Sequence, residues 1–317
     1  MQRLSIIVPL TGDLKRLEDT LVSVLENQPQ RSEVVVVLNE PYDDPYQLRG
    51  EVKFVEAPRG ADLADCLACG LAASEAPIVH TIAGGVEAMP GWADAALARF
   101  STADVAAVAP LVVDRKDPRR ILSAGLRWTT AGSIARIASG ARLDRFAASD
   151  HVLCGPELAA AFYRRDVLEA VESLQSQGSD LAAATELGLA IRQAGFCAVQ
   201  EPACVTTATR DLLTCGGAWR EGVAGERLFR RWTTVPGWKR SWAAHAALVG
   251  MECLQSPLRP SILARLAGRC WAALGFDMPR TVAGGSRGFA SREGSVLCPA
   301  HFGGADARRA CRSRAAG

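Results

Sequence analysis

The sequence contains no long hydrophobic run. No stretch of its 317 residues reaches the roughly 18 to 20 consecutive apolar residues that a membrane-spanning helix needs. Met1-Gln2-Arg3 leads directly into a short apolar segment, without the hydrophobic region of a secretory signal peptide. Because 49% of the residues are nevertheless hydrophobic, the chain can form a large core. These features predict a cytoplasmic protein.

Patterns of metal-binding residues are also missing. The four histidines, His80, His151, His245 and His301, have no ligand spacing, and the ten cysteines have no repeated spacing. Cys66-x-x-Cys69 has the spacing of a redox pair or of half a zinc site. It falls within an amphipathic segment in which Cys66 occupies the apolar stripe, so core packing is favoured. A cysteine-based metal or redox protein is therefore a distant alternative.

The charge is distributed unevenly along the chain. Residues 1–209 contain 19 Lys and Arg against 27 Asp and Glu, whereas residues 210–317 contain 17 against 7. The net charges of the two parts are therefore −8 and +10. In the second part arginines alternate with tryptophans, which favours helices on an anionic membrane surface over nucleic-acid binding. Ordinary helices packed on the preceding domain are the other interpretation.

Strand and helix patterns alternate in the first two thirds of the chain. Residues 4–8 and 34–38 are apolar runs typical of buried parallel strands, and residues 14–25 between them carry apolar side chains at helical spacing. Further strands are expected at 53–55, 78–82, 105–113 (interrupted at Pro110) and 196–199, further helices at 63–71, 93–100, 164–174 and 181–194, and a hairpin at 129–133. This order predicts an α/β fold in which helices flank a largely parallel sheet.

The alternation stops near Asp211. Residues 219–232, 238–254 and 260–274 are expected to form two or three helices, and the remainder is rich in Gly, Ser and Arg without periodicity. We therefore expect three parts: an α/β domain over residues 1–210, a basic amphipathic helical region over 211–275, and a disordered tail over 276–317.

Six segments between residues 4 and 210 form an ordered set. They are LSIIVPLTGDLKRLEDTLVSVLENQ, EVVVVLNEP, APIVHTIAGGVEAMPGW, ILSAGLRWTTAGSIARIASG, AAAFYRRDVLEAV and ATELGLAIRQAGF. In this order they resemble the opening strand and helix, the nucleotide loop, the metal loop with its Pro-Gly-Trp turn, two acceptor-side segments and the base-carrying helix of family 2 glycosyltransferases. The resemblance implies a GT-A fold, with a mixed, mostly parallel sheet flanked by helices and, here, a C-terminal helical appendage.

The same resemblance implies a chemistry. It implies a nucleotide-diphosphosugar donor, a Mg²⁺ or Mn²⁺ ion on an Asp-x-Asp loop, and inversion at the sugar by direct attack of an acceptor hydroxyl. A metal or another cation must neutralise the leaving diphosphate, and a carboxylate must take the proton of the acceptor. The family positions for the acidic groups fall here on Leu38, on Ala83-Gly84-Gly85, and on Ala183 and Ala184; those for an Arg and an Asn fall on Leu67 and Ala68. The Asp-x-Asp metal ligands are thus absent.

The candidate site residues follow from these positions. The candidate catalytic carboxylates are Glu186, in the next acidic position of the last helix, and Asp180, for which a helix N-cap is the alternative role. Nucleotide-sugar contacts, mainly through the backbone, are expected from Pro9, Leu10, Thr11, Asn39, Glu40, Arg59, Gly84 and Gly85. For a metal, Glu87 is the best candidate ligand.

Two functions are compatible with this pattern. The first is a glycosyltransferase that moves a sugar from a nucleotide-diphosphosugar to a cell-envelope glycan or polysaccharide, without a required metal, at the inner face of the plasma membrane. The second is a catalytically inactive pseudo-glycosyltransferase that keeps the fold as a binding or assembly module. The missing carboxylates motivate the second hypothesis.

Overall fold

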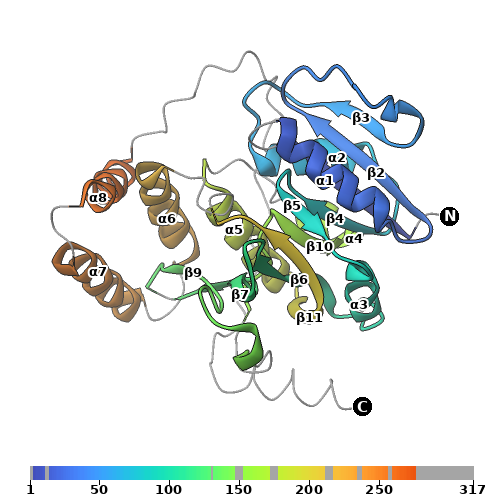
Figure 1. The fold of residues 1–317 in the computed structure, drawn as a ribbon. Helices are drawn as coiled ribbons and strands as arrows, with labels where there is room; N and C mark the ends of the chain where they lie inside the picture. The colour runs from blue at the N-terminus through green and yellow to red at the C-terminus, as the bar shows by residue number, and fades with distance from the viewer. Residues whose placement is uncertain are drawn as a thin grey trace.

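A central sheet organises the chain in the computed structural model (Figure 1). The structure describes residues 3–10, 14–129, 131–146, 153–171, 178–210, 217–233, 238–255 and 259–275. The strands of this sheet are β1 (Leu4–Pro9), β2 (Ser32–Leu38), β3 (Lys53–Glu56), β4 (Ile78–Ile82), β5 (Val86–Ala88), β6 (Val105–Asp114), β7 (Asp117–Ser123), β10 (Ala160–Arg164) and β11 (Cys197–Ala208). A separate hairpin pairs β8 (Leu126–Trp128) with β9 (Ile134–Arg136).

The sheet is mixed and mostly parallel, which confirms the predicted fold class. Its order is β3-β2-β1-β4-β10-β6-β11-β5, with β7 paired to β6. The pairs β1–β2, β1–β4, β2–β3 and β6–β11 are parallel, while β10 runs antiparallel to both β4 and β6. Consequently β1, β2, β4, β6 and β11 all end at the same edge of the sheet, where α/β proteins place their ligands.

Helices cover the sheet on the faces that their apolar stripes predict. The short helices η1 (Leu48–Gly50) and η2 (Leu143–Arg145) lie in loops, while α1 (Leu14–Glu26), α2 (Leu63–Ala72), α3 (Trp92–Arg99), α4 (Arg165–Val171) and α5 (Asp180–Gln193) pack on the sheet. In α1 the buried side chains include Leu17, Leu21 and Val24, as the spacing predicts. Every residue of β1 is buried, the pattern of a strand covered on both faces.

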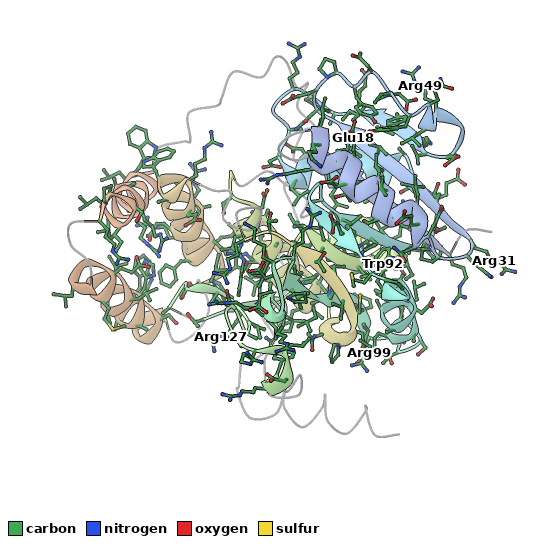
Figure 2. The ribbon with its side chains drawn as sticks, in the orientation of Figure 1. Glu18, Arg31, Arg49, Trp92, Arg99 and Arg127 are labelled. Atoms are coloured by element: carbon green, nitrogen blue, oxygen red, sulfur yellow. The ribbon has the colours of Figure 1, made fainter. Side chains whose placement is uncertain are left out.

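An aromatic cluster holds α3 against β4 and β10. Trp92, labelled in Figure 2 at the start of α3, is buried with its ring 4.6 Å from the His80 ring, and His80 lies 3.8 Å from the Phe162 ring. Burial lowers the pKa of His80 well below its usual value, because the charged form loses its water. His80 is therefore a neutral core residue, in line with the absence of a ligand spacing around it.

Several strands differ from expectation. The strands β5 and β7 were not predicted. The strand β10 (Ala160–Arg164) was not predicted either, because its alanines gave no strand signal. The strand β11 was expected to end at 199 and runs to Ala208, because a register shift between Glu201 and Val205 accommodates Pro202. Pro110 does not interrupt β6. The expected hairpin is present, with Thr129 N–H donating to the Ser133 carbonyl at 3.0 Å.

Three helices follow the sheet, as predicted: α6 (Ala218–Trp232), α7 (Trp238–Gln255) and α8 (Pro260–Ala273). In Figure 1, α7 and α8 lie at the side of the molecule farthest from β3, and α6 lies between them and the sheet. No helix within the described ranges is both long and apolar enough to cross a bilayer. The expected tail at 276–317 lies outside the described residues.

Glycine contacts bring α6 and α8 into close packing. A Cβ atom added at Gly222 would lie 2.0 Å from the Arg265 carbonyl oxygen, and one added at Gly268 would lie 2.1 Å from the Trp219 carbonyl oxygen. Neither backbone carbonyl can move without shifting its helix. The close packing of α6 on α8 therefore requires glycine, which has no side chain, at both positions.

We expect Gly222→Ala to lower the free energy of unfolding by roughly 1–3 kcal/mol, because α6 and α8 must separate. Gly225→Ala on the same helix is the matched control, since a Cβ atom there meets nothing within 4 Å. The control substitution should raise the free energy of unfolding by up to about 1 kcal/mol, because alanine has a higher helix propensity than glycine. Thermal denaturation measures both, and equal melting temperatures for the two variants would contradict the close packing.

Candidate active site

The glycine pair after β4 is tied into the chain through its own amides. Gly84 N–H donates to the Pro9 carbonyl at 3.1 Å, and Gly85 N–H donates to the Arg16 carbonyl at 3.1 Å and to Thr20 Oγ1 at 2.8 Å. Gly85 has φ +96°, which explains the need for glycine. The phosphate contact predicted for these two N–H groups therefore has no free donor in this conformation.

The other predicted nucleotide contacts are dispersed along the same edge. Asn39 Nδ2 donates to the Ala61 carbonyl at 3.2 Å and so joins the end of β2 to the loop before α2. Glu40 and Arg59 are exposed, whereas Leu10 is buried in the core. Thr11 lies outside the described residues. Binding by these residues stays a prediction.

Glu87, the predicted metal ligand, is paired with an arginine. Its carboxylate forms an ion pair with Arg115 and accepts a hydrogen bond from Thr207 Oγ1 at 3.4 Å. Arg115 also lies 3.9 Å from Asp19, which Lys15 contacts at 3.1 Å. No group of three or more His, Cys, Asp or Glu side chains in the described ranges is arranged to hold a metal ion. At Glu87 the neighbouring cation is thus a guanidinium.

Basic side chains gather where β6 and β11 end. The N–H of Lys116 donates to Asp114 at 3.0 Å and Arg210 Nε donates to it at 2.9 Å, and these two hydrogen bonds hold the pKa of Asp114 below its usual value. The turn from β6 into β7 is exposed and basic. The turn, the start of β7 and the residues linked to them through ion pairs contain six cations and four carboxylates. The cations are Lys15, Arg115, Lys116, Arg119, Arg120 and Arg210, and the carboxylates are Asp19, Glu87, Asp114 and Asp117. This edge therefore favours an anionic ligand.

Asp180 lies in an acidic environment at the start of α5. The N-cap of this helix is Ser179, whose Oγ accepts from Ala182 N–H at 3.4 Å, so the predicted cap role of Asp180 is wrong. Asp180 instead accepts a hydrogen bond from the N–H of Leu63 on α2. Burial and repulsion from Asp62 and Glu157 raise the pKa of Asp180 to about 6. A carboxyl group with that pKa is suited to take a proton near neutral pH.

Glu157 is a site residue that the sequence analysis missed. It is 7% exposed, pairs with Arg136 at 2.9 Å, and lies just before β10. Ala83 N–H donates to the carbonyl of Ala159, so this segment borders the end of β4. The sequence around Glu157, Gly155-Pro156-Glu157, does not by itself indicate a site residue. The position of Glu157 at the site depends on the insertion of β10 between β4 and β6.

Two glycines press the Glu157 segment against α5. A Cβ atom added at Gly188 would lie 2.4 Å from the Cys154 carbonyl oxygen, and one added at Gly155 would lie 3.2 Å from Gly188 Cα. This direct backbone contact fixes the distance between the segment and the helix. It keeps Glu157 close enough to act on Asp180 electrostatically.

Glu186, the other candidate base, is buried and paired with a residue of α6. Its side chain is 3% exposed and lies 2.6 Å from Arg231 Nη1. Burial raises the pKa of Glu186, and Arg231 opposes that rise. Glu87, Asp180 and Glu186 therefore have three different sets of partners. Of the two predicted bases, Asp180 is the less buried and has no guanidinium among its named contacts.

Comparison with known proteins shows the fold. The chain resembles the mannosyltransferase PcManGT from Pyrobaculum calidifontis in complex with GDP-Man and Mn²⁺, at 18% identity over 87% of this chain and 88% of that chain, with a TM-score of 0.52. It also resembles GalNAc-T7 with UDP, GalNAc and Mn²⁺, at 15% identity over 65% of this chain and 43% of that chain, with a TM-score of 0.49. No family model and no curated protein matches the sequence. The chain has a GT-A-like glycosyltransferase fold.

We expect Asp180→Asn to change how stability depends on pH. The folded-state pKa of about 6 exceeds the ordinary 3.8, so the folded chain holds an extra proton between these values and loses stability as pH rises through them. At neutral pH the variant should be more stable than the wild type by about 2–3 kcal/mol, and the difference should vanish below about pH 4. Urea denaturation across this range measures it. Parallel stability curves for the two proteins would show that the pKa of Asp180 is ordinary.

Proposed function

We propose that this chain is a GT-A glycosyltransferase of the family 2 type that neutralises the donor diphosphate with arginine. The ion pair between Arg115 and Glu87 is the observation that carries the proposal. Glu87 follows the loop that would hold the metal, and its carboxylate already has a cationic partner. The donor is a nucleotide-diphosphosugar, and no metal is required.

The basic edge supports the binding step. A diphosphate leaving group gains negative charge as the sugar departs, and a guanidinium presents several N–H donors to phosphate oxygens. Arg115 is 37% exposed, so part of its guanidinium remains open beside its two carboxylate partners. Arg210 and the cations of the β6–β7 turn add to the attraction. Leu10, Asn39 and Arg59 remain proposed contacts of the nucleotide.

The acidic group around Asp180 supports the chemical step. In direct displacement, the acceptor oxygen forms the new bond to the sugar carbon while the bond from that carbon to the diphosphate breaks. The acceptor proton passes to a carboxylate. Asp180 is proposed as this base because its pKa of about 6 lies near the working pH. Asp62 and Glu157 are positioning residues that maintain this pKa, and Glu186 is a structural partner of Arg231.

The acceptor and the location belong to the same proposal. The acceptor-side resemblance of residues 121–140 and 159–171 favours a cell-envelope glycan or polysaccharide, assembled at the inner face of the plasma membrane. We also propose the division into an α/β domain at 1–210, a helical region at 211–275 and a tail at 276–317.

A pseudo-glycosyltransferase is the second candidate. It is favoured by the two glycine amides that are occupied within the chain and by the burial of Glu186 against Arg231. Such a module binds a donor or a glycan without turnover. Transfer or hydrolysis of a bound donor therefore separates the two candidates.

Isothermal titration with UDP-, GDP- and dTDP-sugars tests the donor site. At least one donor should bind equally well with EDTA and with Mn²⁺, and Arg115→Gln should weaken that binding by at least tenfold (about 1.4 kcal/mol). Arg49→Gln is the matched control, because Arg49 is an exposed arginine paired with Asp44 at the periphery in Figure 2. Binding that requires Mn²⁺, or equal losses in both variants, would contradict the proposal.

With the donor that binds, Asp180→Asn should lower the rate of sugar transfer or donor hydrolysis by about 10²–10⁴ while leaving donor affinity within a few fold. The same rate should fall far less in Glu186→Gln, and circular dichroism should establish that this variant is folded. A wild-type chain that binds the donor but never turns it over supports the pseudo-glycosyltransferase instead. Loss of turnover in Glu186→Gln alone would reassign the base.

A further inference from the structure

In α7 and α8, the charged side chains that the structure describes lie toward α6, and large apolar side chains lie on the opposite face. A helix that faces water normally shows the opposite arrangement, with charges on its outer face. Here the described charged residues of both helices contact α6 or each other. This distribution is unusual for helices whose outer surface faces only water.

The inner face holds a network of ion pairs centred on Glu226 of α6. Glu226 contacts His245 Nε2 of α7 and Arg230 Nε, each at 2.9 Å, and it lies 3.9 Å from Arg269 of α8. These partners hold the pKa of Glu226 below its usual value despite its burial. Glu252 of α7 lies 3.5 Å from Arg269. The network removes these charges from the outer surface of α7 and α8.

Arginines of α6 and α8 also take part in ion pairs. Arg265 contacts Glu221 at 3.2 Å, Arg231 contacts Glu186 at 2.6 Å, and Arg269 is only 8% exposed. Arg259, at the N-terminus of α8, remains exposed at the rim.

The outer face is defined by four large side chains: Met251 and Leu254 on α7, and Leu263 and Leu274 on or directly after α8. Trp242 and Trp271 are each 38% exposed but contact α6, with ring centroids 5.0 Å from Phe229 and 6.3 Å from Trp219. The four outer side chains are among the eleven large hydrophobic side chains that are exposed in the described part of the chain, and Leu254 is 81% exposed. The other exposed positions from 242 to 254 and from 261 to 274 within that part are Ala, Gly, Ser and Cys. Single exposed apolar residues are ordinary, but a shared face on which none of these described exposed positions is charged is not.

Charge identifies what covers this outer face. Residues 210–317 have a net charge of +10, so a second copy docked through the same helices would bring like charges together. An anionic lipid surface has the opposite sign, attracts Lys and Arg, and offers an apolar layer below its headgroups.

We propose that the outer face of α7 and α8 docks on the interfacial layer of an anionic lipid bilayer, with the helices lying along the surface. The apolar side chains enter the headgroup boundary, and the cations of the C-terminal part supply the electrostatic attraction. The inference rests on the location proposed above, at the inner face of the plasma membrane, and specifies the part of the chain that contacts the lipid. Its test measures lipid binding and not sugar transfer, so either claim can fail without the other.

Co-sedimentation of the full chain with vesicles tests the proposal. Phosphatidylcholine vesicles with phosphatidylglycerol should bind the wild type at least tenfold better than phosphatidylcholine alone. The double variant Leu254→Glu/Leu274→Glu should lose most of that binding. Val22→Glu is the matched control, since Val22 is 55% exposed on α1, and it should bind like the wild type. Unchanged melting temperatures establish that the variants are folded.

Three outcomes would overturn the proposal. The first is equal sedimentation with both vesicle compositions at low salt, including none with either. The second is a double variant that binds anionic vesicles as well as the wild type does. The third is a dimer, detected by light scattering, that the double variant converts to a monomer without a change in lipid binding, because the outer face would then be an interface between two copies.

Discussion

A carboxylate that leaves water needs a cation or several hydrogen-bond donors beside it, and this constraint shapes the carboxyl edge of the sheet. In the described part of the chain Glu87 pairs with Arg115, Glu157 with Arg136, Glu186 with Arg231, and Glu226 with Arg230 and His245. The Glu226–Arg230 pair lies within α6, and the other pairs join segments that are far apart in the sequence. Asp180 differs, since its neighbours Asp62 and Glu157 are acidic, and burial together with their charges raises its pKa to about 6. The proposed chemistry depends on this contrast: guanidinium groups face the diphosphate, and one carboxyl group is left able to take a proton.

The ion pair between Glu186 and Arg231 also links the two parts of the chain. It joins the buried face of α5 to α6, and α6 in turn packs on α8 through Gly222 and Gly268. The hairpin of β8 and β9 contributes to the same junction, because His245 Nδ1 lies 2.6 Å from the carbonyl of Ala131 and Phe229 stacks on His245. The helical part is therefore attached to the α/β part by the Glu186–Arg231 ion pair and by the contact between His245 and Ala131. A membrane contact of α7 and α8 would act on α5 through α6.

Local patterns in the sequence were sufficient for much of the fold. The buried runs of β1 and β2, the apolar stripe of α1 and the hairpin after β8 depend on residues close in sequence, so their prediction succeeded. The strand β10 and the second half of β11 were missed, because alanines and Pro202 become strand residues only through their neighbours in the sheet. The site was harder to predict for the same reason. The occupied amides of Gly84 and Gly85, the arginine on Glu87 and the position of Glu157 are set by contacts between distant segments.

The central claim is that an arginine, rather than a metal ion, faces the donor diphosphate. Diffraction from crystals grown with a nucleoside diphosphate and Mn²⁺, collected at the manganese absorption edge, tests it most directly. The account predicts electron density for the diphosphate in contact with Arg115 and no anomalous peak within coordination distance of its oxygens. An anomalous peak between the diphosphate and Glu87, with Arg115 turned away, would contradict it.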